Sequence, residues 1–144
     1  MKLSSPAFGP GEAIPSRFTC DGADVSPALD IAGIPEGTAC LALVMDDPDA
    51  PGGTWDHWVA YDIPVTTAVP EAVRSLGIAG RNSWRRPGYG GPCPPFGEHR
   101  YFFRVYALDG PLGLPAGASK KQILEAVKGH VLAEASLMGR YTLR

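Results

Sequence analysis

The chain has 144 residues, of which 44% are hydrophobic and 19% are charged, and its formal net charge is −2. This length and balance predict one soluble globular domain over residues 1–144 and argue against a disordered chain. The chain lacks the basic excess typical of nucleic-acid-binding proteins, so we expect no nucleic-acid partner. No apolar run reaches the length of a membrane span, and residues 1–12 lack the apolar centre of a signal peptide. We therefore expect a cytoplasmic protein without stable membrane insertion.

The first forty residues are irregular, and the turn sequences CDG and PEG divide them into short pieces. Extended segments are predicted near Ile14–Thr19 and near Ala28–Ala32. The chain also has three cysteines, Cys20, Cys40 and Cys93. Because this odd number includes no CxxC pair, the spacing predicts neither a disulfide framework nor a zinc site. We expect reduced thiols, with Cys20–Cys40 as the one pairing that needs checking.

Three apolar segments are predicted as β-strands. The run CLALVMD (40–46) is short and apolar, HWVAYDI (57–63) is rich in aromatic and β-branched residues, and HRYFFRVYALD (99–109) alternates between two faces. Between the second and third strands, glycine and proline predict a long ordered loop, with a short helical turn near Glu71–Ser75.

One helix is predicted near residues 119–128. Ser119 and Gln122 match a capping box, an apolar stripe follows, and Gly129 offers a C-terminal stop. Residues 131–143 could extend this helix, but their glycine, tyrosine and threonine favour a final strand. Several strands and one late helix predict a mainly antiparallel β fold, built as a sandwich.

Period-two phasing places polar residues at the ends of apolar strand faces. The first strand has an apolar face that ends in Asp47, and the third opens with His99 and Tyr101. The predicted face of the second strand consists of His57, Val59, Tyr61 and Ile63. If the first two strands form a hairpin, Asp47 and His57 lie at the same end, beside the loop. The phasing therefore predicts a small polar pocket at the rim of the core.

Simpler interpretations compete with this one. Polar residues are ordinary at strand ends, and Trp55 and Trp58 are expected to pack in the core and loop rather than to hold a ligand. Two loops rich in glycine and proline favour a site, because such loops are ordered and can present backbone amides to an anion. The second of these loops, GYGGPCPPFGEHRY, covers residues 88–101.

The sequences DPDAP…HW and GPCPPFGEHRYFFRVYAL resemble the two signature regions of the phosphatidylethanolamine-binding protein (PEBP) family, also called Raf kinase inhibitor-like proteins. The segments FTCDGADVSPAL, GIPEGT, MDDPDAPGGTWDHWV and GHVLAEASLMGRYTLR resemble its compact bacterial branch in particular. This resemblance covers nearly the whole chain. It implies a large central antiparallel sheet packed on a smaller sheet, little helix, and a homodimer.

The resemblance also implies a pocket for small anions such as phosphate or the phosphoryl headgroup of a lipid. Its ligand-binding residues correspond here to Asp47, Pro51, His57, Gly91, His99 and Tyr101. Asp49 and Arg100 fall within the motifs and are expected to hold loops in place, and Asp46 and Asp56 are expected to be structural or solvated. Animal members have a proline where this chain has Cys93, which would place a thiol beside the pocket.

We expect a non-enzymatic protein for small anions or phosphorylated ligands, without a cofactor or metal. In that interpretation Asp47 orients a histidine, and protonated histidines bind the anion. One alternative is a protein-interaction module that inhibits a kinase or protease, with Arg81, Arg85 and Arg86 near its surface. A less favoured alternative is an enzyme, either with a metal held by two histidines and an aspartate, or with Cys93 or Tyr101 as nucleophile.

Overall fold

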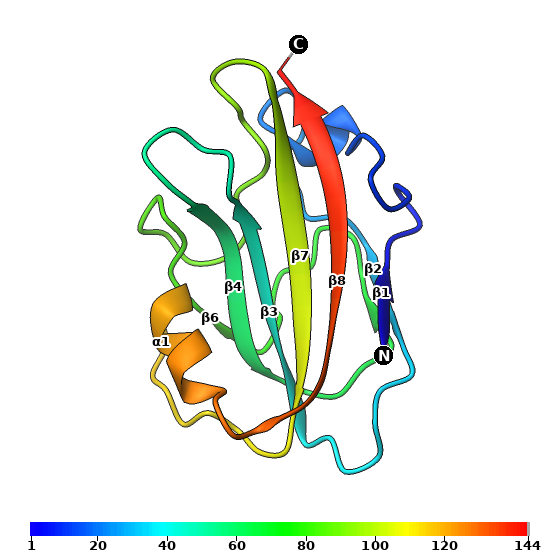
Figure 1. Cartoon of the computed structure of the whole chain (residues 1–144), viewed down its shortest axis with the longest axis vertical. Helices are drawn as coiled ribbons and strands as arrows, with labels where there is room; N and C mark the ends of the chain where they lie inside the picture. Colours follow the sequence, from blue (N-terminus) through cyan, green and yellow to red (C-terminus); the bar gives the residue numbers. More distant parts are fainter. Residues whose placement is uncertain (144) are drawn as a thin grey trace.

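Two antiparallel sheets packed face to face make up the computed structural model, which describes residues 1–143 (Figure 1). The five strands of the large sheet are, in spatial order, β6 (Ile78–Ala79), β4 (Trp55–Ile63), β3 (Cys40–Asp47), β7 (Glu98–Leu108) and β8 (Val131–Thr142). The small sheet has the order β1 (Lys2–Ser4), β2 (Leu29–Ala32) and β5 (Ala68–Val69). The predicted sandwich, with its large and small sheets, is confirmed.

Strand β3 lies at the centre of the large sheet, and all its residues are buried. One face of β3, with Leu43 and Met45, packs on Phe103 of β7 and on the small sheet. The other face, with Val44, packs under the helix and the loop before it. A strand covered on both sides needs a continuous apolar run, which is what the segment CLALVM supplies.

The helix α1 (Lys120–Ala126) forms as predicted. The Ser119 side chain accepts a hydrogen bond from the amide of Gln122, whose side chain accepts one from the Ser119 amide, so the capping box is complete. Ile123 anchors the apolar stripe in the core. Gly129 then takes a φ of 80°, and the chain reverses into β8, so the predicted final strand is also confirmed. None of the described helices is long and apolar enough to cross a membrane.

Two local predictions are wrong. The segment Ile14–Thr19 is not a continuous extended segment, because the 3₁₀ helix η1 (Ser16–Phe18) lies within it. Before this helix, the Ile14 amide donates to the carbonyl of Arg140. Pro15 begins this turn, because its carbonyl accepts the amide of Phe18. Glu71–Ser75 forms a turn without a helix, and Ala72 has a left-handed φ of 54° that interrupts helical geometry.

The cysteine prediction is also wrong. Cys20 and Cys93 form a disulfide with a Cα–Cα distance of 5.5 Å, and Cys40 is the free thiol. Cys40 is buried on the α1 side of β3, where its Sγ donates to the Gly110 carbonyl. The paired cysteines are 73 residues apart in sequence, so tertiary packing alone brings them together.

Two bulges in β4 correct the predicted phase of that strand. Met45 pairs with Trp58 while Asp46 pairs with Asp56, which leaves His57 as an extra residue. A second extra residue lies nearer the other end of β4, where Asp62 has a φ of 48°. As a result, the predicted single face divides between the two cores: Val59 and Tyr61 face α1, and Ile63 faces the small sheet.

Candidate functional site

A cavity of about 380 Å³ opens where β3 ends and where β4 and β7 begin. Five of the six residues assigned from the family motifs line it, namely Asp47, Pro51, His57, His99 and Tyr101. The bulge matters here, because strict alternation would have turned His57 to the α1 side with Val59 and Tyr61. Instead its ring meets Tyr101 edge-on, with 5.2 Å between ring centroids.

Asp47 and His99 form a buried pair at the floor of the cavity. The Nδ1 of His99 lies 2.6 Å from the Oδ2 of Asp47, and the side chains are only 6% and 4% exposed. The other oxygen of Asp47 accepts the amide of Asp49 at 2.8 Å, which fixes the start of the following loop. With Nδ1 engaged, Nε2 is the ring nitrogen that His99 has left for a ligand.

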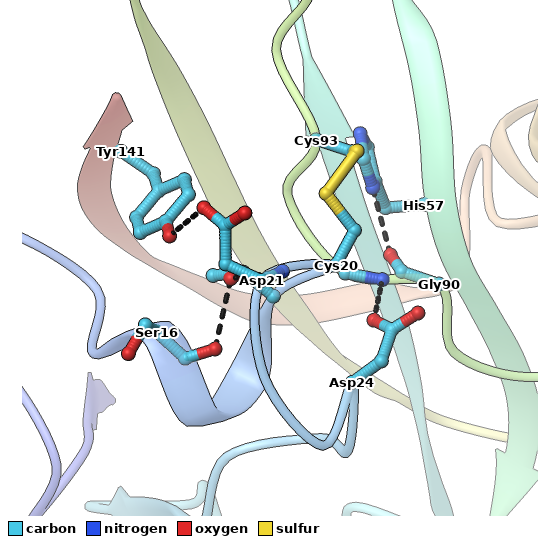
Figure 2. Close-up of a disulfide and its surroundings, with 10 residues drawn as sticks. Ser16, Cys20, Asp21, Asp24, His57, Gly90, Cys93 and Tyr141 are labelled. Carbon is cyan, nitrogen blue, oxygen red and sulfur yellow. Dashed lines mark hydrogen bonds between the residues drawn. A yellow bond between two sulfur atoms is a disulfide. The ribbon is translucent and has the colours of Figure 1, made fainter. Parts of the chain in front are cut away.

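His57 is held differently. Its Nδ1 lies 2.7 Å from the carbonyl oxygen of Gly90, which can only accept, so Nδ1 carries the proton (Figure 2). Burial lowers the pKa of His57 below its ordinary value, against the opposing pull of the Gly90 carbonyl and Asp47. At neutral pH His57 is therefore uncharged, and its Nε2 offers a lone pair.

Two buried donors belong to residues that line the cavity. The hydroxyl of Tyr101 lies near Asp47 and the backbone of Cys93, but within residues 1–143 it makes no hydrogen bond of normal geometry. The Nε1 of Trp55 is likewise buried and unpaired in that part of the chain. Burial and the nearby Asp47 charge raise the pKa of Tyr101, which keeps its hydroxyl protonated. An unpaired buried donor costs roughly 1–3 kcal/mol, so a polar partner for either group would be stabilising.

The remaining wall of the cavity is apolar. It consists of Ala50, Pro51, Trp55, Trp84, Pro94 and Pro95, together with the disulfide-bonded Cys93. Trp55 and Trp84 meet edge-on at 5.6 Å between centroids, and Trp84 also meets His57 at 5.0 Å. Trp55 packs on Trp84, as expected, and it also lines the cavity. Sequence reasoning did not assign Trp84 to the site. Trp58 is a core residue against Tyr89, as expected.

Gly91 does not line the cavity. Its amide donates to the carboxylate of Asp24 at 2.8 Å, so that amide is not offered to a ligand. A Cβ at this position would lie 2.3 Å from the Phe18 carbonyl oxygen and from Asp24. Gly91 is therefore glycine because the 18–24 segment packs directly behind it, which supports the wall of the cavity from outside.

The other acids of the first motif have the structural roles expected of them. Asp49 makes a two-point ion pair with Arg100, with 2.9 Å at each contact, and also accepts the Arg100 amide. These hydrogen bonds lower the pKa of Asp49 to about 2. Asp46 and Asp56 both contact Lys120, which ties α1 to the large sheet.

The donor atoms of the cavity do not form a metal-binding set. Among residues 1–143, no three His, Cys, Asp or Glu side chains are grouped so that they could hold a metal ion. The Nδ1 atoms of His57 and His99 are already hydrogen-bonded to oxygen. Cys93 has no free thiol in its disulfide form, so the proposed reactive thiol beside the pocket is corrected to a cystine.

Comparison with known proteins gives the family. A family model described as phosphatidylethanolamine-binding protein matches residues 4–142. The chain is 50% identical to a UPF0098 protein of Methanothermobacter thermautotrophicus, over 98% of each chain. A PEBP homolog of Chlamydia trachomatis, CT736, has a crystal structure that superposes with a TM-score of 0.96 at 38% identity, covering 99% of this chain and 97% of that one. YbcL of E. coli, described as a new member of the mammalian PEBP family, gives a TM-score of 0.91 at 30% identity over 99% and 98% of the two chains. The chain therefore belongs to the phosphatidylethanolamine-binding protein family, in the bacterial and archaeal branch that contains the UPF0098 and YbcL proteins.

Proposed function

We propose that this protein is a non-enzymatic binder of small tetrahedral anions, including the phosphoryl group of a larger ligand. The observation that carries the proposal is the donor set of the cavity. Tyr101 and Trp55 each have a buried hydrogen-bond donor without a partner among residues 1–143, and they line the same cavity as His57 and His99, whose Nδ1 atoms are engaged and whose Nε2 atoms are left for a ligand. Phosphoryl oxygens are strong acceptors and suit such a set.

The two histidines have different parts in this proposal. His99, whose Nδ1 is held by the Asp47 carboxylate, would present its Nε2 to the anion. His57 is neutral in the empty cavity, so its Nε2 can accept the proton of a monoanionic phosphate or take up a proton as the anion binds. Either route makes binding stronger at lower pH.

The apolar wall bears on the class of ligand. Trp84, Pro94 and Pro95 are well placed to contact the organic part of a phosphate ester rather than the anion itself. The same cavity would accept free phosphate through its polar floor. Titrating the protein with inorganic phosphate, phosphoethanolamine and vesicles containing phosphatidylethanolamine separates a free anion, a soluble headgroup and a lipid surface.

Calorimetry on three alanine variants tests the proposal. His57→Ala and His99→Ala should each weaken phosphate binding by about ten-fold, the equivalent of one charge-assisted hydrogen bond. His130→Ala is the matched control, since His130 is exposed and pairs with Asp109 away from the cavity. Wild-type affinity in both cavity variants would contradict the proposal.

Two further expectations stay predictions. The family resemblance suggests a homodimer, which sedimentation equilibrium of the purified chain checks. A cytoplasmic location is checked by cell fractionation. The Cys20–Cys93 disulfide makes the fractionation test informative. Disulfides persist in oxidising compartments, and inside cells they persist in the proteins of hyperthermophiles.

A further inference from the structure

We propose that the Cys20–Cys93 disulfide positions His57 and makes ligand binding depend on the redox state of the protein. This inference rests on the proposed function, because it concerns regulation of the same cavity. It depends on how two loops meet. The first is the 18–24 loop, which starts at the last residue of η1. The second is the pocket loop, residues 88–97, which forms one wall of the cavity.

The disulfide joins these loops at the wall itself. Cys93 lines the cavity, whereas Cys20 lies on the 18–24 loop and does not (Figure 2). Both cysteines are exposed, so a dithiol reductant can reach the bond. Exposed disulfides are more often labile or regulatory than buried ones.

Hydrogen bonds near the disulfide also join the 18–24 loop to the pocket loop. The Cys20 amide donates to the Pro92 carbonyl at 3.1 Å, the Gly91 amide donates to Asp24 at 2.8 Å, and the Tyr89 hydroxyl donates to the Phe18 carbonyl at 2.7 Å. The 18–24 loop is in turn held to β8, where the Tyr141 hydroxyl donates to Asp21 (Figure 2). The pocket loop therefore takes its position from the 18–24 loop.

The pocket loop in turn orients His57 through Gly90. Gly90 is bonded to His57 twice: its amide donates to the His57 carbonyl at 3.0 Å, and its carbonyl accepts from Nδ1 at 2.7 Å. The second bond sets both the ring orientation and the tautomer of His57. Gly90 is three residues from Cys93, so loosening the loop at Cys93 loosens the acceptor that orients His57.

Reduction of the protein breaks its S–S bond and forms two S–H bonds. A dithiol such as dithiothreitol supplies two electrons and two protons, the S–S bond between Cys20 and Cys93 is cleaved to two thiols, and the dithiol becomes a cyclic disulfide. The hydrogen bonds between the loops then remain without their covalent link. The oxidised protein is the form with a preorganised cavity, and the reduced protein is the form with a mobile wall.

The main experiment measures inorganic phosphate binding by calorimetry in the oxidised protein, after treatment with dithiothreitol, and after reoxidation. We expect about ten-fold weaker binding on reduction, the equivalent of one misplaced hydrogen bond, and recovery on reoxidation. Cys20→Ser should bind as weakly as the reduced protein and should not respond to dithiothreitol. This variant substitutes no residue that lines the cavity, and it leaves Cys93 as a free thiol, as reduction does. Cys40→Ser is the matched control, because Cys40 is a buried free thiol in the other core.

A second measurement follows the position of His57 without a ligand. The ¹⁵N chemical shifts of the His57 ring report its tautomer, and amide exchange of Gly91 and Cys20 reports the contact between the loops. A changed His57 signal and faster exchange on reduction, with the β3 amides unchanged, support the positioning role. Equal phosphate affinity in the oxidised and reduced forms overturns the proposal. If neither form binds phosphate, the proposed function fails, and an unchanged His57 signal on reduction then overturns the positioning role independently.

Discussion

Asp47 and His99 come from two neighbouring strands and meet as a buried pair, with 2.6 Å between Oδ2 and Nδ1. Asp47 is the last residue of β3, and His99 is the second residue of β7. The pair places a carboxylate in the lining of a cavity that we assign to anions. Both oxygens of that carboxylate are engaged within the protein, one by His99 and the other by the Asp49 amide, so we treat Asp47 and His99 as a unit.

Replacing Asp47 by Asn tests this unit. Asn keeps the shape and can still accept from Nδ1, but it removes the negative charge beside His99, and its NH₂ group cannot accept the Asp49 amide. We expect about ten-fold weaker phosphate binding and a loss of roughly 1–3 kcal/mol in the free energy of unfolding, measured by calorimetry and urea titration. Asp49→Asn is the control, because its partner Arg100 is half exposed and such a pair contributes only about 0–1 kcal/mol. Equal effects of the two variants would show that burial of the Asp47 pair has no special importance.

The lowered pKa of His57 predicts acid-sensitive stability. Between the ordinary histidine pKa of about 6.5 and the lower value in the folded protein, the unfolded chain binds more protons at this site. The contribution of His57 to stability is therefore complete above pH 6.5 and declines as the pH falls below it. Urea unfolding from pH 8 to pH 5 should show this decline in the wild type, and a smaller one in His57→Gln. A wild-type profile in His57→Gln would contradict the assignment.

The disulfide should also stabilise the fold, apart from its proposed effect on binding. It closes a long loop, since its cysteines are 73 residues apart, and a loop of that length corresponds to about 4 kcal/mol of denatured-state entropy. We expect the midpoint of urea unfolding to fall in Cys20→Ser and in the reduced wild type by the same amount. Dithiothreitol should leave the midpoint of Cys20→Ser unchanged, and a further decrease there would mean that the reductant acts elsewhere.

Gly91→Ala should be far more harmful than an ordinary loop substitution. The added Cβ would lie 2.3 Å from the Phe18 carbonyl, so the 18–24 loop and the pocket loop must separate. Such overpacking costs typically 1–3 kcal/mol, and it should weaken phosphate binding as well, because the wall of the cavity moves. Gly110→Ala is the matched control, because a Cβ there meets no atom within 4 Å and the backbone is not left-handed. Equal thermal stability of the two variants would contradict the packing that we describe around Gly91.

The sequence by itself determined the long strands, the helix and much of the site. The apolar run of β3, the alternation of β7 and the Ser119 capping box are local patterns, and each predicts its element without knowledge of the rest of the chain. The motif residues Asp47 and His99 could be placed at one end of the sheet, because strand phasing and hairpin pairing follow from period two. The same phasing placed Tyr101 beside His99, and the family motifs supplied Pro51 by resemblance.

Only the tertiary structure decided how those parts meet. The bulge that turns His57 into the cavity depends on pairing with β3, since a strand has no bulge until it has a partner. The Cys20–Cys93 bond, the place of Trp84 in the cavity wall and the role of Gly91 behind it each join segments that are distant in the sequence. Local propensity describes neighbours along the chain, whereas the shape of a cavity depends on which distant segments pack against one another, and that choice is made by the fold as a whole.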